Sequence, residues 1–375
     1  MADSKSSAPV PGDYEPGHHP ALPPPISQVG PVAWLRNNLF STPLNTLLTL
    51  VGLGLIYVSV PPLLDWAFFS ADWMGESRDD CSRDGACWVF IGAWLKQLFY
   101  GRYPTEELWR INLAYVLVVA SLVWLLIPKA PHKAWVGVFL LVVFPVVAFY
   151  LFTGGQWGLV EVETSLWGGL FLTLVVAVVG IVASLPLGIL LALGRRSDLP
   201  IISALSAAFI ELWRGVPLIT VLFMASVMFP LFLPEGLNFD KLLRALVGVT
   251  LFASAYMAEV IRGGLQAIPR GQYEAAQALG LPYWRMMGFV ILPQALKLVI
   301  PGIVNTFIGL FKDTTLVYII GLYDLLGIAQ TAAQNPDWVG FAIEGYVFAG
   351  LIFWAFCFGM SRYSQNLERR LHTGH

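Results

Sequence analysis

Charged residues are scarce in this sequence. Asp, Glu, Lys and Arg together make up 12% of its 375 residues, whereas soluble proteins carry about 25%. Hydrophobic residues make up 57%, more than the share of about 45–50% that soluble proteins use. A soluble fold cannot hide so much apolar surface from water, so a lipid bilayer has to cover it. The composition therefore indicates an integral membrane protein.

Other features are also missing, and each absence excludes a class of protein. With a formal net charge of −2, the chain lacks the basic excess that is typical of a nucleic-acid binder. Three cysteines are too few for a disulfide scaffold or a cysteine-rich iron–sulfur site. The five histidines lie in the N-terminal tail, in the segment 129–133 and at the C-terminus, outside the apolar runs. We therefore expect no metal site, no nucleic-acid partner and no enzyme centred on intramembrane histidines.

Apolar runs of about 20 residues, the length that crosses a bilayer, occur repeatedly. They predict an all-α membrane protein with about eight transmembrane helices, at 43–63, 110–128, 134–153, 166–194, 202–232, 242–262, 287–310 and 340–361. Two shorter apolar pieces accompany them. We expect 88–100 to form an interfacial or loop helix, and 315–330 to form a partly buried or re-entrant element.

Composition divides the chain into three parts. Residues 1–40 are rich in Pro, Ser and Gly and predict a disordered cytoplasmic tail. Residues 41–155 hold three spans, which are almost free of charge, and a polar loop. Residues 156–375 hold five spans and most of the charges that fall within apolar runs. We therefore expect a three-span N-terminal extension followed by a core of five spans.

Positive charge predicts the orientation, because Lys and Arg gather on the cytoplasmic side. In an eight-span arrangement most cations fall on one side, and an acid-rich first loop falls on the other. The exceptions are Arg78, Arg83, Lys96, Arg102 and Lys241. Both termini are then cytoplasmic. Cys81 and Cys87 lie in the acidic loop on the oxidising side, where they either pair or stay free.

Charged side chains within a membrane span are costly, so each one suggests a function or a pairing partner. The charges in the predicted core spans and at their ends are Glu211, Arg214, Glu259, Arg262, Lys297, Lys312, Asp313 and Glu344. Two interpretations stay open for them. They line a polar path, or they are structural: Arg214 pairs with Glu211, Lys312 pairs with Asp313, and Lys297 reaches out to water.

The segment after the sixth span, residues 261–302, differs from the other loops. Its stretch QYEAAQAL, residues 272–279, favours a short helix. Gly280 suits the left-handed residue that ends such a helix, and Pro282 prevents its continuation. A second short helix then begins near Tyr283. Two short helices of this kind are suited to fill a groove in another protein, although loop helices also lie on membranes.

This segment resembles the EAA loop of ABC-importer permeases, through Glu274-Ala275-Ala276, Gly280 and the stretch ILPQA at 291–295. Other stretches resemble the polar amino-acid permease family of histidine, glutamine and arginine importers. They are ELWRGVPL at 211–218, AYMAEVIRGG at 255–264, NTFI at 305–308 and KDTT at 312–315. The likeness covers about residues 160–365. The N-terminal extension, with GRYPTEELWR at 101–110, is similar to the general L-amino-acid permease subgroup.

The resemblance implies a type I importer fold in a bacterial inner membrane. This chain would form the pathway with a second permease subunit. Two copies of a cytosolic ATPase would bind ATP and Mg, and a periplasmic binding protein would deliver the L-amino acid. Because no GxxxxGK[ST] motif occurs here, the chain is expected to hold no cofactor and not to be an enzyme. The resemblance assigns coupling to the loop 271–295, with Glu274, Ala275, Ala276, Leu279 and Gly280.

A path for an amino-acid zwitterion needs partners for both of its charges, because unpaired buried charges are costly. The candidates are Glu211, Arg214, Gly215, Pro217, Asn305, Lys312, Asp313 and Thr314. Among them, Gly215–Pro217 interrupts span five and frees backbone groups to bind. An ion-coupled secondary amino-acid transporter is the alternative. Such folds show internal repeats, and none relates 43–153 to 166–361.

Overall fold

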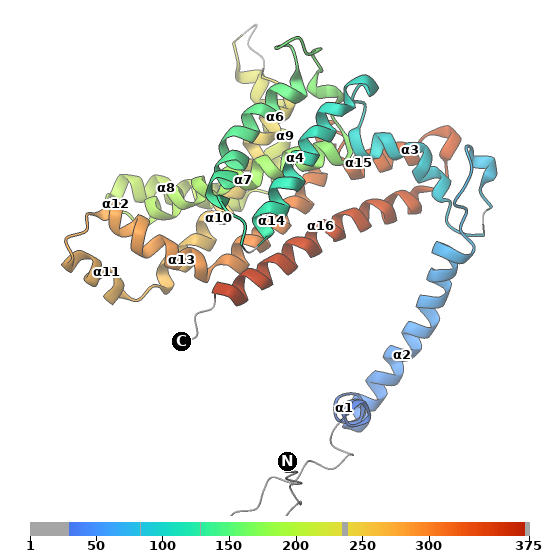
Figure 1. The fold of residues 1–375 in the computed structure, drawn as a ribbon, viewed down its shortest axis with the longest axis horizontal. Coiled ribbons are helices and arrows are strands. Elements are labelled where there is room, and N and C mark those ends of the chain that lie inside the picture. Colours follow the sequence, from blue (N-terminus) through green and yellow to red (C-terminus); the bar gives the residue numbers. More distant parts are fainter. Residues whose placement is uncertain (1–29, 83, 128, 235–238, 372–375) are drawn as a thin grey trace, which may run out of the picture. The chain divides into compact units, whose positions relative to one another are not determined.

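The computed structural model describes residues 30–82, 84–127, 129–234 and 239–371. These residues form helices joined by short loops, with no β-sheet among them (Figure 1). Their contacts divide them into two compact units. The N-terminal unit holds the described residues up to Ala71 together with 84–86. The main unit holds Asp72–Ser82 and the described chain from Cys87 onward.

The N-terminal unit consists of α1 (Pro31–Asn38), α2 (Pro43–Leu64) and the π-helix η2 (Asp65–Phe69). Thr42 begins α2, because its hydroxyl accepts the N–H of Asn45 at 3.1 Å and so satisfies a free donor of the first turn. Together α2 and η2 are long and apolar enough to cross a membrane, in agreement with the first predicted span. The predicted disordered tail, 1–40, lies mostly outside the described residues, and its last part forms α1.

Six further stretches of the main unit are long and apolar enough to cross a membrane. They are η4 (Thr105–Glu107) with α4 (Leu108–Leu126); α5 (Lys133–Val138) with η5 (Phe139–Val143) and α6 (Phe144–Thr153); α7 (Gly169–Arg195); α10 (Lys241–Ala267); α14 (Ile300–Asp313) with η10 (Thr314–Ile320); and α16 (Ala342–Leu371). A bent pair adds α8 (Pro200–Gly215) and α9 (Leu218–Phe223) with η7 (Met224–Met228) and η8 (Phe229–Phe232). Over the described residues the total is seven spans, or eight with this pair, as the sequence predicted.

Shorter helices complete the main unit. They are α3 (Trp88–Tyr100), α11 (Arg270–Ala278), α12 (Tyr283–Met286) with η9 (Met287–Ile291), α13 (Leu292–Leu298) and α15 (Leu325–Ala333). Single turns of 3₁₀-helix lie at Arg78–Asp80, Thr164–Leu166 and Pro336–Trp338.

The predicted fifth span, 202–232, is not one straight helix. Its two halves, α8 and the stretch 218–232, meet at an angle of 100°. Val216 is extended, with φ −108° and ψ 133°. A residue before proline avoids the helical region, so Pro217 ends α8 and α9 starts in a new direction. The sequence indicated an interruption here but not a turn of this size.

The predicted seventh span, 287–310, has the wrong bounds. Val299 separates α13 from α14, and the stretch that can cross a membrane is Ile300–Ile320. Pro301 stands in the first turn of α14, where a missing N–H costs little. The predicted re-entrant piece, 315–330, is divided as a consequence: η10 completes this span, and α15 begins after Gly321, whose φ is +75°.

The centre of the main unit is the packing of α7 along α10 (Figure 1). Small residues allow the helices around it to approach closely, as is usual in membranes. A Cβ on Gly188 would lie 2.7 Å from the side chain of Met257, and one on Gly180 would lie 2.9 Å from Leu310. Side chains of both helices are buried in two apolar clusters formed by described residues of the main unit.

The short helix α3 packs against α7, α15 and α16. Phe90 is buried, and its ring centroid lies 5.6 Å from Trp338 and 6.5 Å from Phe341. The interpretation of 88–100 as an interfacial or loop helix missed this packing. By their contacts α3, α4 and α6 belong to the same compact unit as the five core spans.

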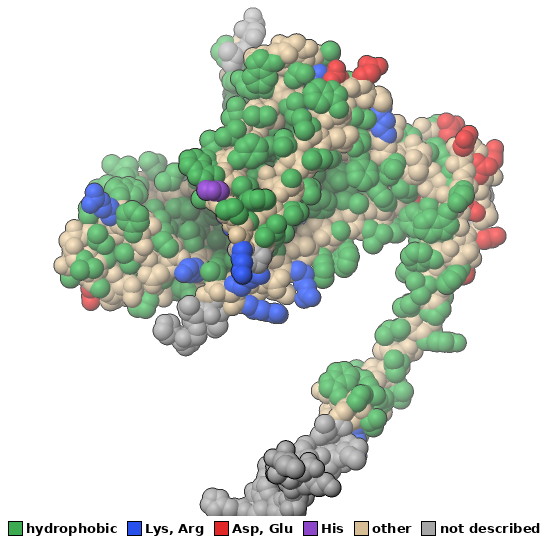
Figure 2. All heavy atoms as spheres, viewed as in Figure 1, with side chains coloured by type: hydrophobic (Ala, Val, Ile, Leu, Met, Phe, Trp, Pro, Cys, Tyr) green, Lys and Arg blue, Asp and Glu red, His purple; other side chains and the backbone are tan. Residues whose placement is uncertain are grey.

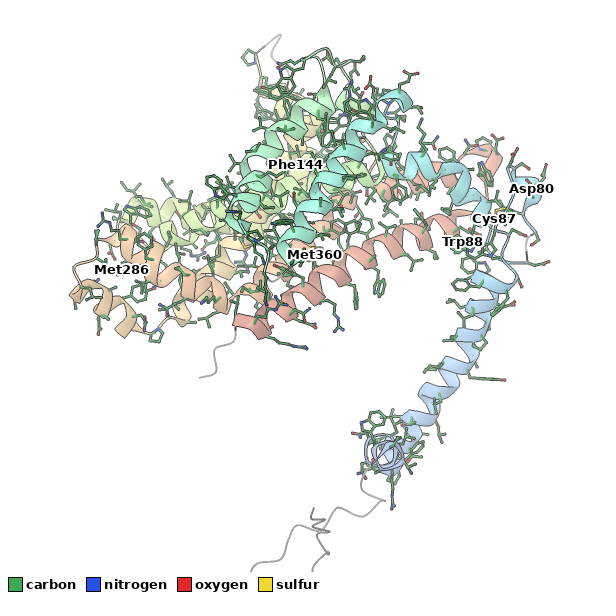
Figure 3. The ribbon with its side chains drawn as sticks, viewed as in Figure 1. Asp80, Cys87, Trp88, Phe144, Met286 and Met360 are labelled. Atoms are coloured by element: carbon green, nitrogen blue, oxygen red, sulfur yellow. A yellow bond between two sulfur atoms is a disulfide. The ribbon has the colours of Figure 1, made fainter. Side chains whose placement is uncertain are left out.

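The loop before α3 is closed by a disulfide between Cys81 and Cys87, which settles the choice that the sequence left open. Asp80 accepts the backbone N–H groups of Glu76 and Ser77, each at 2.9 Å. These hydrogen bonds, that of Ser77 most, hold the pKa of Asp80 below its usual value. Cys87 donates its own N–H to the carboxylate of Glu344 at 3.2 Å. Figure 3 labels Asp80, Cys87 and Trp88 at this end of the main unit.

Candidate functional site

The loop expected to couple to a partner folds as two short helices. The first, α11, ends as Gly280 adopts a left-handed conformation with φ +72°. The N–H of Leu281 then donates to the carbonyl of Ala276 at 3.2 Å, and that of Gly280 donates to Gln277 at 2.9 Å. This is the hydrogen-bond pattern of a glycine-terminated helix. The second helix, α12, begins at Tyr283. Both features were predicted.

One face of this loop packs on the main unit. Ala276 is 3% exposed and joins Met286, Met287 and Ile291 in the apolar cluster that contains Ile261 of α10. The other face is open and partly apolar. Leu279, Trp284 and Phe289 are 80%, 70% and 78% exposed.

The predicted coupling residues therefore divide between the two faces. Glu274, Ala275, Leu279 and Gly280 are exposed, whereas Ala276 anchors the loop. Of the two alanines, only Ala275 is free to contact another protein.

A cluster of ionic side chains joins the ends of α7, α8 and α10. Its centre is Glu259 of α10, whose carboxylate lies 2.7 Å from Arg262 and 2.9 Å from Arg195 of α7. Arg195 also reaches Glu211 of α8 at 3.1 Å. The side chain of Glu259 is 16% exposed, and that of Arg195 is 26% exposed. Ion pairs in such partly buried surroundings are screened less than pairs on the surface, so the Arg195–Glu259 pair helps to hold α7 against α10. The pair with Glu211, whose side chain is 67% exposed, contributes less to the position of α8.

Arg214 belongs to this cluster but is held more loosely. Its guanidinium lies 3.7 Å from Glu259 and 5.5 Å from the centre of the Tyr256 ring. The pair of Arg214 with Glu211, one of the structural alternatives, does not form among the ion pairs of the described residues. Glu211 forms its ion pair with Arg195 instead.

The second predicted polar group lies along α14. Asn305 and Lys312 are exposed, and Asp313 is half-buried. Thr314 is only 1% exposed and donates its hydroxyl to the carbonyl of Phe311 at 2.7 Å. No ion pair joins Lys312 and Asp313 in the described part of the chain. Helices α8 and α14 both pack on α10, which places the two predicted groups around one central helix.

Two members of the charged cluster were not among the candidate site residues. Arg195 lies just after the predicted fourth span, 166–194, and Glu259 was expected only as one of the charges in the core spans. The spacing of Glu259 and Arg262, three residues apart on one helix, was the available signal for their pair. No sequence signal linked Arg195 to Glu211 and Glu259, because that contact depends on how α8 crosses α7 and α10.

The described residues thus form a multi-span membrane protein, with a charged cluster where α7, α8 and α10 meet and a loop with an exposed, partly apolar face. A family model described as "Binding-protein-dependent transport system inner membrane component" matches residues 184–373. The chain belongs to this family of multi-span inner membrane components.

Two relatives match nearly the whole chain. The "Inner membrane amino-acid ABC transporter permease protein YhdY" of Escherichia coli (strain K12) is 56% identical over 95% of this chain and 97% of its own. The "Glutamate/glutamine/aspartate/asparagine transport system permease protein BztC" of Rhodobacter capsulatus is 42% identical over 94% of this chain and 96% of its own. A solved structure, "Crystal structure of an amino acid ABC transporter with histidines", is 30% identical over 54% of this chain and 92% of its own, with a TM-score of 0.48.

Proposed function

We propose that this chain is the permease subunit of an ATP-driven amino-acid importer. The observation that supports this most is the 56% identity, over 95% of the chain, with an amino-acid ABC transporter permease. The chain forms the translocation pathway together with a second permease subunit. It is not itself an enzyme: two copies of a cytosolic ATPase bind ATP and Mg, and a periplasmic amino-acid-binding protein delivers the substrate.

The loop 271–295 couples this chain to the ATPase. Its exposed apolar side chains, Leu279, Trp284 and Phe289, are of the kind that fills a groove on another protein. Ala276 and the residues buried with it hold the loop against α10, so a movement of the loop is passed to α10. Gly280 provides the turn between its two helices.

The substrate path runs along the face of α10 that α8 and α14 flank. On α8, Glu211 and Arg214 supply charge, and the break at Gly215–Pro217 leaves backbone groups without helical partners. On α14, Asn305 and Lys312 are exposed and Asp313 is half-buried. The hydroxyl of Thr314 already donates to the carbonyl of Phe311. Thr314 therefore supports the position of the exposed polar residues beside it on the path.

Both termini lie in the cytoplasm. Figure 2 supports this orientation for the main unit: Lys and Arg side chains gather near the end of α16, and Asp and Glu side chains gather near α3 and beside the end of α6. Cationic ends stay on the cytoplasmic side of a membrane. The loop closed by Cys81 and Cys87 then faces the periplasm, where disulfides persist.

The test is reconstitution of the purified complex in vesicles that contain ATP. We expect the chain to copurify with an ATPase, and uptake to depend on both ATP and the binding protein. A panel of labelled amino acids, including glutamate, glutamine, aspartate and asparagine, identifies the substrate. Abolition of uptake by a protonophore while ATP is maintained would instead favour an ion-coupled secondary transporter.

A further inference from the structure

The cluster around Glu259 has an unequal number of charges. Three guanidinium groups, those of Arg195, Arg214 and Arg262, share two carboxylates, those of Glu211 and Glu259. The cluster therefore carries one excess positive charge. The excess cation attracts an anion, and a carboxylate is the anion that pairs best with a guanidinium.

The excess charge is located at Arg214. Arg262 donates three hydrogen bonds to Glu259, and Arg195 donates one to Glu259 and one to Glu211. Arg214 donates no hydrogen bond in the described part of the chain, and its closest carboxylate oxygen is 3.7 Å away. Its side chain is 41% exposed. A guanidinium offers five N–H donors in a planar fork, and here they remain open to an incoming group.

The position of Arg214 suits a ligand that moves through the protein. It lies in the last turn of α8, directly before the break at Val216 and Pro217. A Cβ on the neighbouring Gly215 would meet no atom within 4 Å, so no other described part of the chain covers the end of α8 at that point. On its other side the ring of Tyr256, centred 5.5 Å from Arg214, stacks against the cation and limits its orientations.

We propose that Arg214 binds the α-carboxylate of the transported amino acid, which is the third carboxylate that the cluster lacks. This inference rests on the proposed function and adds the chemistry of recognition to it. A carboxylate matches the guanidinium fork with two parallel hydrogen bonds. Hydrogen bonds from Arg195 and Arg262 hold the carboxylate of Glu259 in place. It therefore cannot move closer to Arg214, and the N–H groups of Arg214 stay available to the substrate.

The experiment measures recognition of the α-carboxylate without the binding protein, which selects amino acids on its own. Labelled L-glutamine is bound to the purified permease–ATPase complex and displaced with unlabelled L-glutamine or L-glutamine α-amide. If the uptake panel shows that another amino acid is carried better, that amino acid and its α-amide replace them. We expect the wild-type complex to prefer the free acid by about tenfold or more, the size of a charge-assisted hydrogen bond.

Substitution at Arg214 should remove this preference. In Arg214→Gln we expect acid and amide to compete within about twofold of each other, and in Arg214→Lys we expect an intermediate ratio, because the charge stays but the fork is lost. Lys297→Gln is the matched control: Lys297 is an exposed cation on α13 outside the cluster, and its loss should leave the ratio unchanged. If Arg214→Gln does not assemble, Arg214→Lys decides the question.

An unchanged ratio in the Arg214 variants, or a wild-type complex that does not distinguish acid from amide, overturns the assignment of Arg214. A different result would contradict the proposed function itself. The assembled wild-type complex would then take up no amino acid from the panel, whatever residue stands at position 214.

Discussion

At the scale of single residues, the coupling loop depends on the backbone of Gly280. Its φ of +72° lies in the left-handed region, yet no atom surrounds the place of a Cβ within 4 Å. A side chain at this position would therefore strain the backbone but would not clash with other atoms. The strain of a left-handed L-residue is about 1–2 kcal/mol, enough to change the turn that joins α11 to α12 without unfolding the protein.

Replacement of Gly280 should uncouple transport from ATP hydrolysis. We expect Gly280→Val to reduce the number of amino acids taken up per ATP hydrolysed, because a β-branched residue strains the turn that presents the loop. Gly271→Ala is the control: Gly271 has ordinary backbone angles and open space around it, and the ratio should not change. Equal coupling ratios in the two variants, with normal assembly of both, would contradict the role of this turn.

Asp324 is a second residue with an unusual setting. It is fully buried and begins α15 by accepting the N–H groups of Gly327 and Leu326 at 2.9 and 3.2 Å. Burial raises the pKa of Asp324 to about 7, although these hydrogen bonds oppose the change. In the unfolded chain this carboxyl titrates near 4. The folded protein thus binds a proton here that the unfolded chain has already lost, over the range of about pH 4 to 7.

The stability contributed by protonated Asp324 is therefore complete below about pH 4 and declines as the pH rises towards 7. We expect Asp324→Asn, which keeps a capping oxygen and cannot ionise, to flatten this dependence and to be at least as stable as the wild type at pH 8. Thermal unfolding of the purified complex between pH 5 and pH 8 measures the effect. Asp337→Asn, at an exposed acid, is the control. Identical pH profiles for Asp324→Asn and the wild type would refute the prediction.

At the scale of helices, three glycines join α3 to α7. A Cβ on Gly169 would lie 2.4 Å from the carbonyl oxygen of Leu98, and one on Gly101 would lie 2.4 Å from the backbone of Gly168. Both Gly101 and Gly169 have positive φ, +65° and +62°. The backbones of the two helices therefore meet where no other residue fits. This contact makes α3 part of the main unit and not an addition to it.

This junction predicts that alanine is tolerated at Gly92 of α3 but not at Gly169, the first residue of α7. Gly169→Ala should prevent stable assembly or reduce the unfolding temperature strongly, because backbone atoms cannot move aside. Gly92→Ala, within α3 and with open space around it, should be neutral or slightly stabilising, since alanine favours a helix by about 1 kcal/mol over glycine. The yield and thermal stability of the purified chain measure both. A stable Gly169→Ala variant would show that α3 and α7 are not in close contact.

The sequence predicted the helices whose signals are local. Long apolar runs identified α7, α10 and α16, and Gly280 with Pro282 located the end of α11. It indicated an interruption at Gly215–Pro217 but could not predict the 100° turn there, because a proline break does not set the angle between the two helices. It also missed the shift of the seventh span to Ile300–Ile320, since apolar residues occur on both sides of Val299 and no long charged stretch marks the boundary.

The contacts of the candidate site were harder to predict. Their partners lie far apart in the chain, as Arg195 and Glu259 do. The local spacing even favoured a different pair, Glu211 with Arg214. Only the packing of α8 on α7 and α10 decides which arginine each carboxylate meets.

At the scale of the whole molecule, the membrane orientation follows from charge and is testable through the disulfide. In a Cys357→Ser background we expect a membrane-impermeant thiol reagent to label Cys81 only after reduction, and only from the periplasmic side. Cys87 is fully buried and should react more slowly than Cys81. An untreated sample is the control for reduction. Labelling confined to the cytoplasmic side would reverse the proposed topology.

The packing of α3 has a consequence for the order in which the protein is made. Phe90 of α3 finds its partners Trp338 and Phe341 only when nearly the whole chain has left the ribosome. At a synthesis rate of about 5–20 residues per second, that delay is on the order of tens of seconds. With 13 residues, α3 is too short to cross the bilayer alone. Until α15 and α16 arrive to cover it, α3 therefore depends on its glycine contact with α7, beside a loop that its own disulfide can already close.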